Sequence, residues 1–219
     1  MNTDEVPLQP YYKDEACKLY HGDCLRLLPH LPEADLYLLD LPYGIDLKEH
    51  GRNGYDWKVK GDQSQEFGHA VLAEIFQRPT IAFASPMLPW GGKWRQFLVW
   101  DKGPTVGGGG DIATCWKLSW ELIQVRNTGR LSGKRDEAVL SYHITQRDYA
   151  LHPCQKPIGL LQYLICKTTQ PGGLVVDLTC GSGSVLEAAK ISGRRAIGVE
   201  LEKSYCEIAA KRICQGVLF

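Results

Sequence analysis

The chain lacks any apolar run long enough to cross a membrane, and it lacks an excess of charge of either sign. Lysine plus arginine and aspartate plus glutamate number 25 each, so a nucleic-acid partner would have to be bound by local patches. The first ten residues, MNTDEVPLQP, do not follow the basic, apolar, small-residue order of a signal peptide. We therefore expect a cytoplasmic protein with no membrane partner.

The cysteines lack the spacing of a disulfide framework or of a metal site. None of the 8 cysteines forms a C-x-x-C pair, and Cys166, Cys180 and Cys206 lie in apolar or motif-like segments. This favours reduced, partly buried thiols. A zinc site is a weak alternative, and we expect no metal, because the candidate ligands have no recognised spacing; they are His21, Cys24, His152 and Cys154.

The pattern of elements predicts one α/β domain over residues 1–219. The last third is clearest: the apolar run GLVVDL (173–178) is followed by a glycine turn, a helix and the strand RAIGVEL (195–201). Such a βαβ unit predicts a Rossmann-like fold, with a mixed, mostly parallel sheet and helices on both faces. Further strands are expected at 17–20, 34–40, 80–85 and 95–102, and further helices at 24–31, 64–76, 157–168 and 202–213.

The segment 101–150 has a different character. Its stretch GPTVGGGGD contains four consecutive glycines, which lose too much backbone entropy to hold regular structure. Two short β-like pieces follow, WELIQV (120–125) and EAVLSYH (137–143). We interpret 101–150 as an irregular insert on a rigid scaffold, whose basic residues either contact a ligand or are solvated surface charge. These residues are Arg126, Arg130, Lys134, Arg135 and Arg147.

The sequence DLTCGSGS (177–184) places glycines where a strand passes into a helix. Gly181 and Gly183 would allow a tight turn and a close approach of ligand to helix amides, and Glu200 ends the next strand, where an acid commonly binds ribose hydroxyls. Asp177 disfavours a pyrophosphate and favours a positively charged cofactor such as S-adenosyl-L-methionine. A plain strand–helix turn is the structural alternative, and the absent third glycine makes a nicotinamide oxidoreductase remote.

Several motifs in order resemble those of the amino-group DNA methyltransferases. DLPYG (40–44) is similar to the family's catalytic D-P-P-Y, and the segment 177–213 is similar to its cofactor-binding D-P-F-x-G-S-G-T with a later G-x-E. HPCQKP (152–157) resembles H-P-T-Q-K-P, FLVWDK resembles a W-D-K strand, and the segment 21–40 resembles the opening G-D-C element. The catalytic motif comes first, as in the permuted β group. Leu41, Leu178 and Thr179 depart from the usual residues.

The resemblance implies transfer of a methyl group from S-adenosylmethionine to an exocyclic amino group in DNA. The Asp40 side chain and the Leu41 carbonyl would accept the amine protons, with Pro42 restricting Leu41 to extended geometry and Tyr43 stacking on the base. A base in duplex DNA would have to flip out. The acid at Asp40 favours adenine, since cytosine-amino enzymes of this kind more often carry serine there.

The resemblance also implies a set of cofactor contacts. Asp23 would lie near the cofactor's adenine, although a simple turn acid is the alternative. Lys156, at a predicted helix start, would hold the methionine carboxylate or be a surface lysine. The remaining predicted cofactor residues lie in the 177–184 segment and the following strand; they are Asp177, Thr179, Gly181, Gly183 and Glu200. The 101–150 insert is the candidate target-recognition region.

Other functions share these patterns. A cytosine-N4, RNA or protein-glutamine methyltransferase would keep the cofactor and change the substrate, and a catalytically weak methyltransferase-like DNA-binding protein would keep the fold. Leu41, Leu178 and the neutral net charge motivate the last alternative. The small size is typical of a bacterial or phage protein from a restriction-modification or phage setting. The short insert is compatible with a homodimer or with a partner that sets target choice.

Overall fold

The computed structural model of the chain describes residues 9–45, 48–50, 56–58, 62–104, 119–143 and 155–215. Each strand and helix expected from the sequence forms within a few residues of its expected limits. The strands are β1 (Tyr12–Lys13), β2 (Cys17–His21), β3 (Leu36–Leu39), β4 (Lys48–His50), β5 (Asp56–Lys58), β6 (Thr80–Ala84), β7 (Gln96–Asp101), β8 (Trp120–Arg126), β9 (Val139–Ser141), β10 (Leu174–Asp177) and β11 (Arg195–Glu200). The helices are α1 (Cys24–Leu27), α2 (Glu66–Glu74), α3 (Ile158–Thr168), α4 (Ser184–Ile191) and α5 (Lys203–Cys214), and a 3₁₀ turn spans Leu28–His30.

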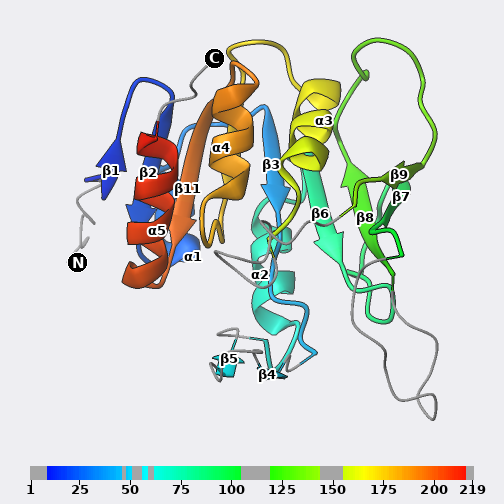
Figure 1. Cartoon of the computed structure of the whole chain (residues 1–219), viewed down its shortest axis with the longest axis horizontal. Helices are drawn as coiled ribbons and strands as arrows, with labels where there is room; N and C mark the ends of the chain where they lie inside the picture. The colour runs from blue at the N-terminus through cyan, green and yellow to red at the C-terminus, as the bar shows by residue number, and fades with distance from the viewer. Residues whose placement is uncertain are drawn as a thin grey trace.

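One large mixed sheet carries the fold. Its strand order is β1-β2-β11-β10-β3-β6-β8-β7-β9 (Figure 1). The five neighbours from β2 to β6 are parallel, whereas β8 is antiparallel to both β6 and β7. The predicted mostly parallel mixed sheet is therefore confirmed. β4 and β5 pair separately.

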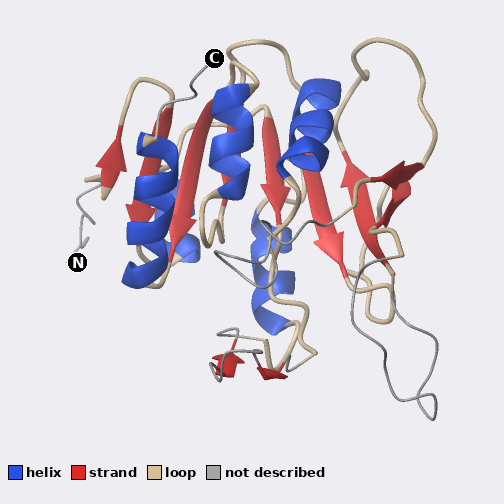
Figure 2. Ribbon diagram, in the orientation of Figure 1, coloured by secondary structure: helices blue, strands red, loops and turns tan. Residues whose placement is uncertain are grey.

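Helices cover both faces of the sheet (Figure 2). The central strands are buried on both sides, so their side chains alternate between two apolar clusters. In β3, Leu36 and Leu38 pack into the cluster that contains residues of α3, α4 and α5, whereas Tyr37 and Leu39 pack into the cluster that contains residues of α1 and α2. This explains why the strand sequences are continuous apolar runs. Within the described ranges, no helix combines the length and apolar character that crossing a bilayer requires.

The order of the strands creates a topological switch point between β10 and β3. The chain leaves β10 through α4 to reach β11 on one side, and it leaves β3 through α2 to reach β6 on the other. The loops after two adjacent parallel strands therefore diverge, and ligands of open α/β sheets bind in the crevice that this divergence opens. These two loops carry the predicted catalytic and cofactor motifs.

The segment 101–150 is not wholly an irregular insert, which corrects the sequence interpretation. β8 pairs with both β6 and β7, and its Ile123 and Gln124 are fully buried. The glycine run and its flanks (105–118) and residues 144–150 lie outside the described residues. Part of the predicted recognition region is thus scaffold.

The interpretation of the basic residues in this segment also needs correction. Arg126 is buried in β8, where its guanidinium donates to the Leu72 carbonyl at 2.7 Å and lies over the rings of Phe76 and Trp94. Because β8 runs antiparallel to β6, the loop after it lies at the amino ends of the parallel strands, away from the edge of the catalytic motif. Exposed cations of that loop are therefore not beside the predicted target base; they are Arg130, Lys134 and Arg135. Arg147 lies outside the described residues.

The cysteines within the described ranges are free thiols. Cys180 and Cys206 are buried as expected, and burial raises the pKa of the Cys206 thiol to about 12. Cys166 is exposed, whereas the sequence favoured partly buried thiols, because it lies on the side of α3 turned away from the sheet.

Candidate active site

Four of the predicted site residues lie at or just after the carboxyl ends of four adjacent strands. β2 is followed by Asp23, β11 ends at Glu200, β10 ends at Asp177, and β3 is followed by Asp40. Because these strands are parallel neighbours in the order β2-β11-β10-β3, the four acids lie along one edge of the sheet. The sequence motifs are therefore brought together as predicted.

The catalytic segment (residues 40–43) and the cofactor loop (residues 177–183) touch each other. The Thr179 hydroxyl donates to the backbone carbonyl of Asp40 at 3.3 Å, although the two residues are 139 positions apart. Burial raises the pKa of the Asp177 carboxyl, and repulsion from the Asp40 carboxylate adds to this effect. The two motifs thus lie against each other at the switch point.

The two glycines of the cofactor loop, Gly181 and Gly183, meet different structural requirements. Gly183 has φ +81° and precedes α4, and a Cβ atom there would lie 2.9 Å from the Cβ of Ala209 in α5. Gly181 has φ +50°, and a Cβ there would meet nothing within 4 Å. Gly183 therefore permits close packing of α5 against the loop, whereas Gly181 supplies a left-handed backbone conformation beside open space.

Arg212 of α5 holds the cofactor loop in place through hydrogen bonds. Its guanidinium donates to the backbone carbonyl and the hydroxyl of Ser182, both at 3.0 Å, and to Gln155 at 2.6 Å. It also pairs with Glu187 of α4 at 3.1 Å. Arg212 therefore ties the loop to α4, α5 and the Gln155–Lys156 element. We did not predict this residue, because only the fold shows that a basic residue on α5 faces the loop.

Asp177 is a buried carboxyl whose protonation is altered by its surroundings. It is 2% exposed and accepts a hydrogen bond from the Thr179 amide at 3.0 Å. Burial, with repulsion from Asp40 and Glu200, raises its pKa to about 8 despite that bond. A positively charged group placed here would stabilise the ionised carboxylate. The site therefore fits a cofactor with a positive charge and fits a pyrophosphate poorly.

Glu200 is engaged by the backbone around it. Its two carboxylate oxygens accept from the amides of Gly181 and Glu202, each at 2.8 Å, and burial raises its pKa. Asp23 is exposed and caps α1 by accepting from the Leu25 amide at 2.9 Å. The amide of Gly22 donates to the Glu200 carbonyl at 2.9 Å, which places Asp23 near Glu200. Roles of Asp23 and Glu200 in cofactor binding stay predictions.

The two leucines that depart from the family pattern are both core residues. Leu41 and Leu178 are each 1% exposed and belong to the same apolar cluster beneath the site. A leucine at either position gains burial where a proline would give rigidity. The departures therefore leave the loops anchored to the core, and the backbone carbonyl of Leu41 is present whatever the side chain.

The catalytic segment is joined to an ion-pair network on its far side. Asp40 accepts from the Tyr43 hydroxyl and pairs with the Lys156 ammonium, both at 2.8 Å. Lys156 is 5% exposed and also lies 3.3 Å from Glu121 of β8, whose other oxygen pairs with Lys102. Lys156 thus contacts two carboxylates of the protein, and its contact with a cofactor carboxylate stays a prediction.

Sequence reasoning missed Glu121 and Lys102. Burial by itself would raise the pKa of the Glu121 carboxyl, but the ammonium groups of Lys156 and Lys102 outweigh burial and lower it. Glu121 is therefore ionised at neutral pH. An acid within the otherwise apolar strand WELIQV was an available signal, because charged side chains in such positions are rarely buried without partners.

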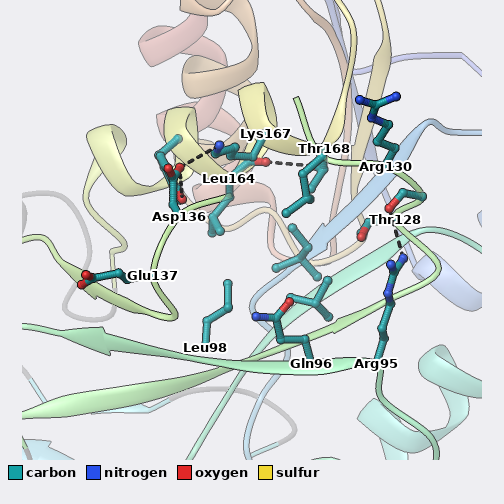
Figure 3. Close-up of a pocket in the computed structure, with 15 residues that line it drawn as sticks. Arg95, Gln96, Leu98, Thr128, Arg130, Asp136, Glu137, Leu164, Lys167 and Thr168 are labelled. Atoms are coloured by element: carbon teal, nitrogen blue, oxygen red, sulfur yellow. Dashed lines mark hydrogen bonds and ion pairs between the residues drawn. The ribbon is translucent and has the colours of Figure 1, made fainter. Parts of the chain in front are cut away.

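A pocket of about 390 Å³ lies elsewhere (Figure 3). Its wall is formed by the beginnings of β6 and β7, the end of β8 and the last turn of α3, with Arg95, Arg130 and Lys167 among its lining residues. These strand ends lie opposite the edge that carries Asp40 and Asp177, so the pocket does not belong to the candidate site. Lys167 is paired there with Asp136 at 2.7 Å.

A metal is not indicated within the part of the chain that the structure describes, where no group of three or more acidic, histidine or cysteine side chains could hold an ion. Of the four alternative zinc ligands, His21 and Cys24 belong to the described residues, whereas His152 and Cys154 lie outside them.

Comparisons with known proteins agree with this geometry. Residues 98–211 match a family model for N6/N4 enzymes described as DNA methylase. The Type II methyltransferase M2.LlaDCHI of Lactococcus lactis subsp. cremoris is 38% identical, over 96% of this chain and 94% of that protein.

Solved structures show the same fold. The complex of M1.HpyAVI with SAM has a TM-score of 0.65 and 20% identity, covering 90% of this chain and 98% of the other. PvuII DNA methyltransferase, described as cytosine-N4-specific, has a TM-score of 0.72 and 15% identity, covering 96% of this chain and 91% of the other. The Rossmann-like methyltransferase fold is thus confirmed.

Proposed function

The chain belongs to the N6/N4 DNA methylase family, and from this premise we propose that it methylates the exocyclic amino group of adenine in DNA, with S-adenosyl-L-methionine as donor. The predicted family and the predicted cofactor are both confirmed at the level of the family. The observation that carries the proposal is the contact between the two motifs, the 3.3 Å hydrogen bond from Thr179 to the Asp40 carbonyl.

The cofactor loop supplies the features that this donor requires. When bound, S-adenosylmethionine would supply a methyl group from its sulfonium, and the electrons of the broken S–C bond would stay on the sulfur. Asp177 offers a buried carboxylate to the ammonium or sulfonium charge. The turn at Gly181 and Gly183 allows close approach of the ligand to the start of α4. Thr179, Glu200 and Asp23 border the same edge, and we assign them to the cofactor.

The catalytic segment supplies acceptors for the target amine. Nitrogen gains positive charge as its lone pair forms the new bond to carbon, and the Asp40 carboxylate and the Leu41 carbonyl stabilise that charge. One proton must then leave the nitrogen, and Asp40, whose side chain is 26% exposed, accepts it and passes it to solvent. Pro42 holds the segment extended, and Tyr43 stacks on the base.

The proposal includes flipping of the target base, because an amine within a stacked duplex cannot reach Asp40 at the switch point. The connection between β7 and β8 begins and ends at the same edge of the sheet, since Asp101 pairs with Trp120 there. We therefore assign target recognition to this part of the 101–150 segment rather than to the loop that follows β8. A homodimer or a specificity partner stays a prediction that light scattering can check.

A second candidate is methylation of cytosine at N4. The similarity in fold to a cytosine-N4-specific enzyme supports it, whereas the carboxylate at Asp40 supports adenine. RNA or protein-glutamine methylation and a catalytically weak DNA-binding protein have no specific support from the geometry.

The test is transfer of labelled methyl groups from S-adenosylmethionine to separate DNA, RNA and protein pools. We expect labelled DNA that yields N6-methyladenine after digestion to nucleosides. Asp40→Ala should abolish transfer while cofactor binding, measured by calorimetry, survives. The matched control is Asp136→Ala, because Asp136 has the same 26% side-chain exposure and a lysine partner but lies at the other edge. Full activity of the Asp40→Ala protein would reject the assignment.

A further inference from the structure

Four charged side chains form an alternating row beside the catalytic segment. Lys156 lies between Asp40, at 2.8 Å, and Glu121, at 3.3 Å, and Glu121 in turn pairs with Lys102. The exposed fractions of the side chains are 5% for Lys156, 13% for Glu121 and Lys102, and 26% for Asp40. Charge is balanced within this partly buried row, and Lys156 has a carboxylate on each side.

The position of Lys156 conflicts with the chemistry assigned to Asp40. The target nitrogen becomes positive while it is hydrogen-bonded to this carboxylate, and an ammonium on the same carboxylate opposes that charge. At about 5 Å and an effective dielectric of about 20, repulsion of roughly 0.4 to 0.8 of a unit charge on the nitrogen would slow the reaction roughly ten- to hundredfold. Displacement of Lys156 from Asp40 during methyl transfer would remove this repulsion.

Glu121 is placed to receive the ammonium. Its backbone is fixed by pairing of β8 with β6 and β7, where Glu121 lies opposite Trp100. Its Oε1 atom is held by Lys102, so its Oε2 atom faces Lys156. The Tyr43 hydroxyl lies 2.8 Å from Asp40 and 3.2 Å from Glu121 and has one proton to donate. With the ammonium on Glu121, that proton would be free to be donated to Asp40.

We propose that Glu121 is a positioning residue, which draws the Lys156 ammonium away from Asp40 when the target amine binds. Glu121 touches neither substrate nor cofactor in this arrangement and acts through Lys156. The inference rests on the proposed amino-group methylation, because only a nitrogen that becomes positive at Asp40 makes the lysine unfavourable there.

The test is a double-mutant cycle on the methyl-transfer rate in a single turnover, with saturating cofactor and DNA. Glu121→Gln should slow transfer ten- to hundredfold and change the cofactor dissociation constant less than about threefold, since the cofactor loop is untouched. In a Lys156→Gln background the same change should cost less than about threefold, because no ammonium remains to be drawn away. The matched control is Glu74→Gln on the exposed surface of α2, which should leave the rate unchanged.

A second variant keeps the test valid if Glu121→Gln does not fold. Glu121→Gln combined with Lys102→Gln preserves the charge balance but lacks the second carboxylate, so it should also be slow. A wild-type rate in either variant, or an equal loss from Glu121→Gln with and without Lys156, would overturn the inference while leaving the function intact. Absence of transfer by the wild-type protein would refute the proposed function itself.

Discussion

Cofactor binding should expel a proton from Asp177. Burial raises the pKa of this carboxyl to about 8, so about nine-tenths of the free protein holds the proton at pH 7. A positive group of the cofactor beside the carboxyl favours the ionised form, and binding at pH 7 should therefore release about 0.9 proton. The affinity of the protein for the cofactor should therefore rise about ninefold from pH 6 to pH 7, which corresponds to roughly 1.3 kcal/mol.

Isothermal titration calorimetry in buffers of different ionisation enthalpy measures this proton directly. The range from pH 6 to 7 keeps the α-amino group of the ligand protonated, since such groups titrate at about 7.7–8.0. Asp177→Asn should bind the cofactor more weakly and abolish most of the proton release. The pKa of Glu200 is also raised, so any proton exchange that remains in the Asp177→Asn variant should again be a release of protons. Release below about 0.2 proton with a flat affinity profile would refute the reasoning.

Three further predictions follow from the same region. The pKa of Asp177 is raised from its ordinary value of 3.8 to about 8 in the folded protein, so the free energy of unfolding should fall by about 1.4 kcal/mol per pH unit as the pH rises between these two values. Asp177→Asn should flatten the dependence of thermal unfolding on pH in this range, and an unchanged slope would contradict the prediction. Gly183→Ala should cost about 1–3 kcal/mol more in chemical denaturation than Gly172→Ala, which has a similar φ of +78° but open space around the added Cβ, and equal losses would count against the packing role. Tyr43→Ala should weaken productive DNA binding by about 1–3 kcal/mol in steady-state assays, whereas Tyr43→Phe keeps the stacking ring and should lose less; the reverse order would show that the hydroxyl matters more than the ring.

Much of the fold could be predicted because its signals are local. The apolar runs before Asp40 and Asp177 have the composition of strands buried on both faces, and the glycine turn after Asp177 marks a strand-to-helix passage. The meeting of the two motifs followed from the rule that ligands bind at the carboxyl ends of strands near a switch point. The contact between Thr179 and the Asp40 carbonyl agrees with that expectation.

The errors concern strand direction and register, which local patterns do not encode. β8 was read as part of an irregular insert because a glycine run precedes it, yet its pairing with β6 and β7 makes it scaffold. Its antiparallel direction moves Arg130 to the edge away from the catalytic segment. Arg126 looked exposed because it is basic, although aromatic rings and the Leu72 carbonyl accommodate it in the core. Glu121 was overlooked because its role depends on a register that only the sheet reveals.

A structure of the protein with S-adenosylhomocysteine would show whether the catalytic segment and the cofactor loop form one active site. We expect the amino group of the ligand to lie against Asp177 and its sulfur to point toward the Asp40 carboxylate. A ligand bound elsewhere, for example in the pocket lined by Arg95 and Lys167, would contradict the claim that the two motifs form one active site.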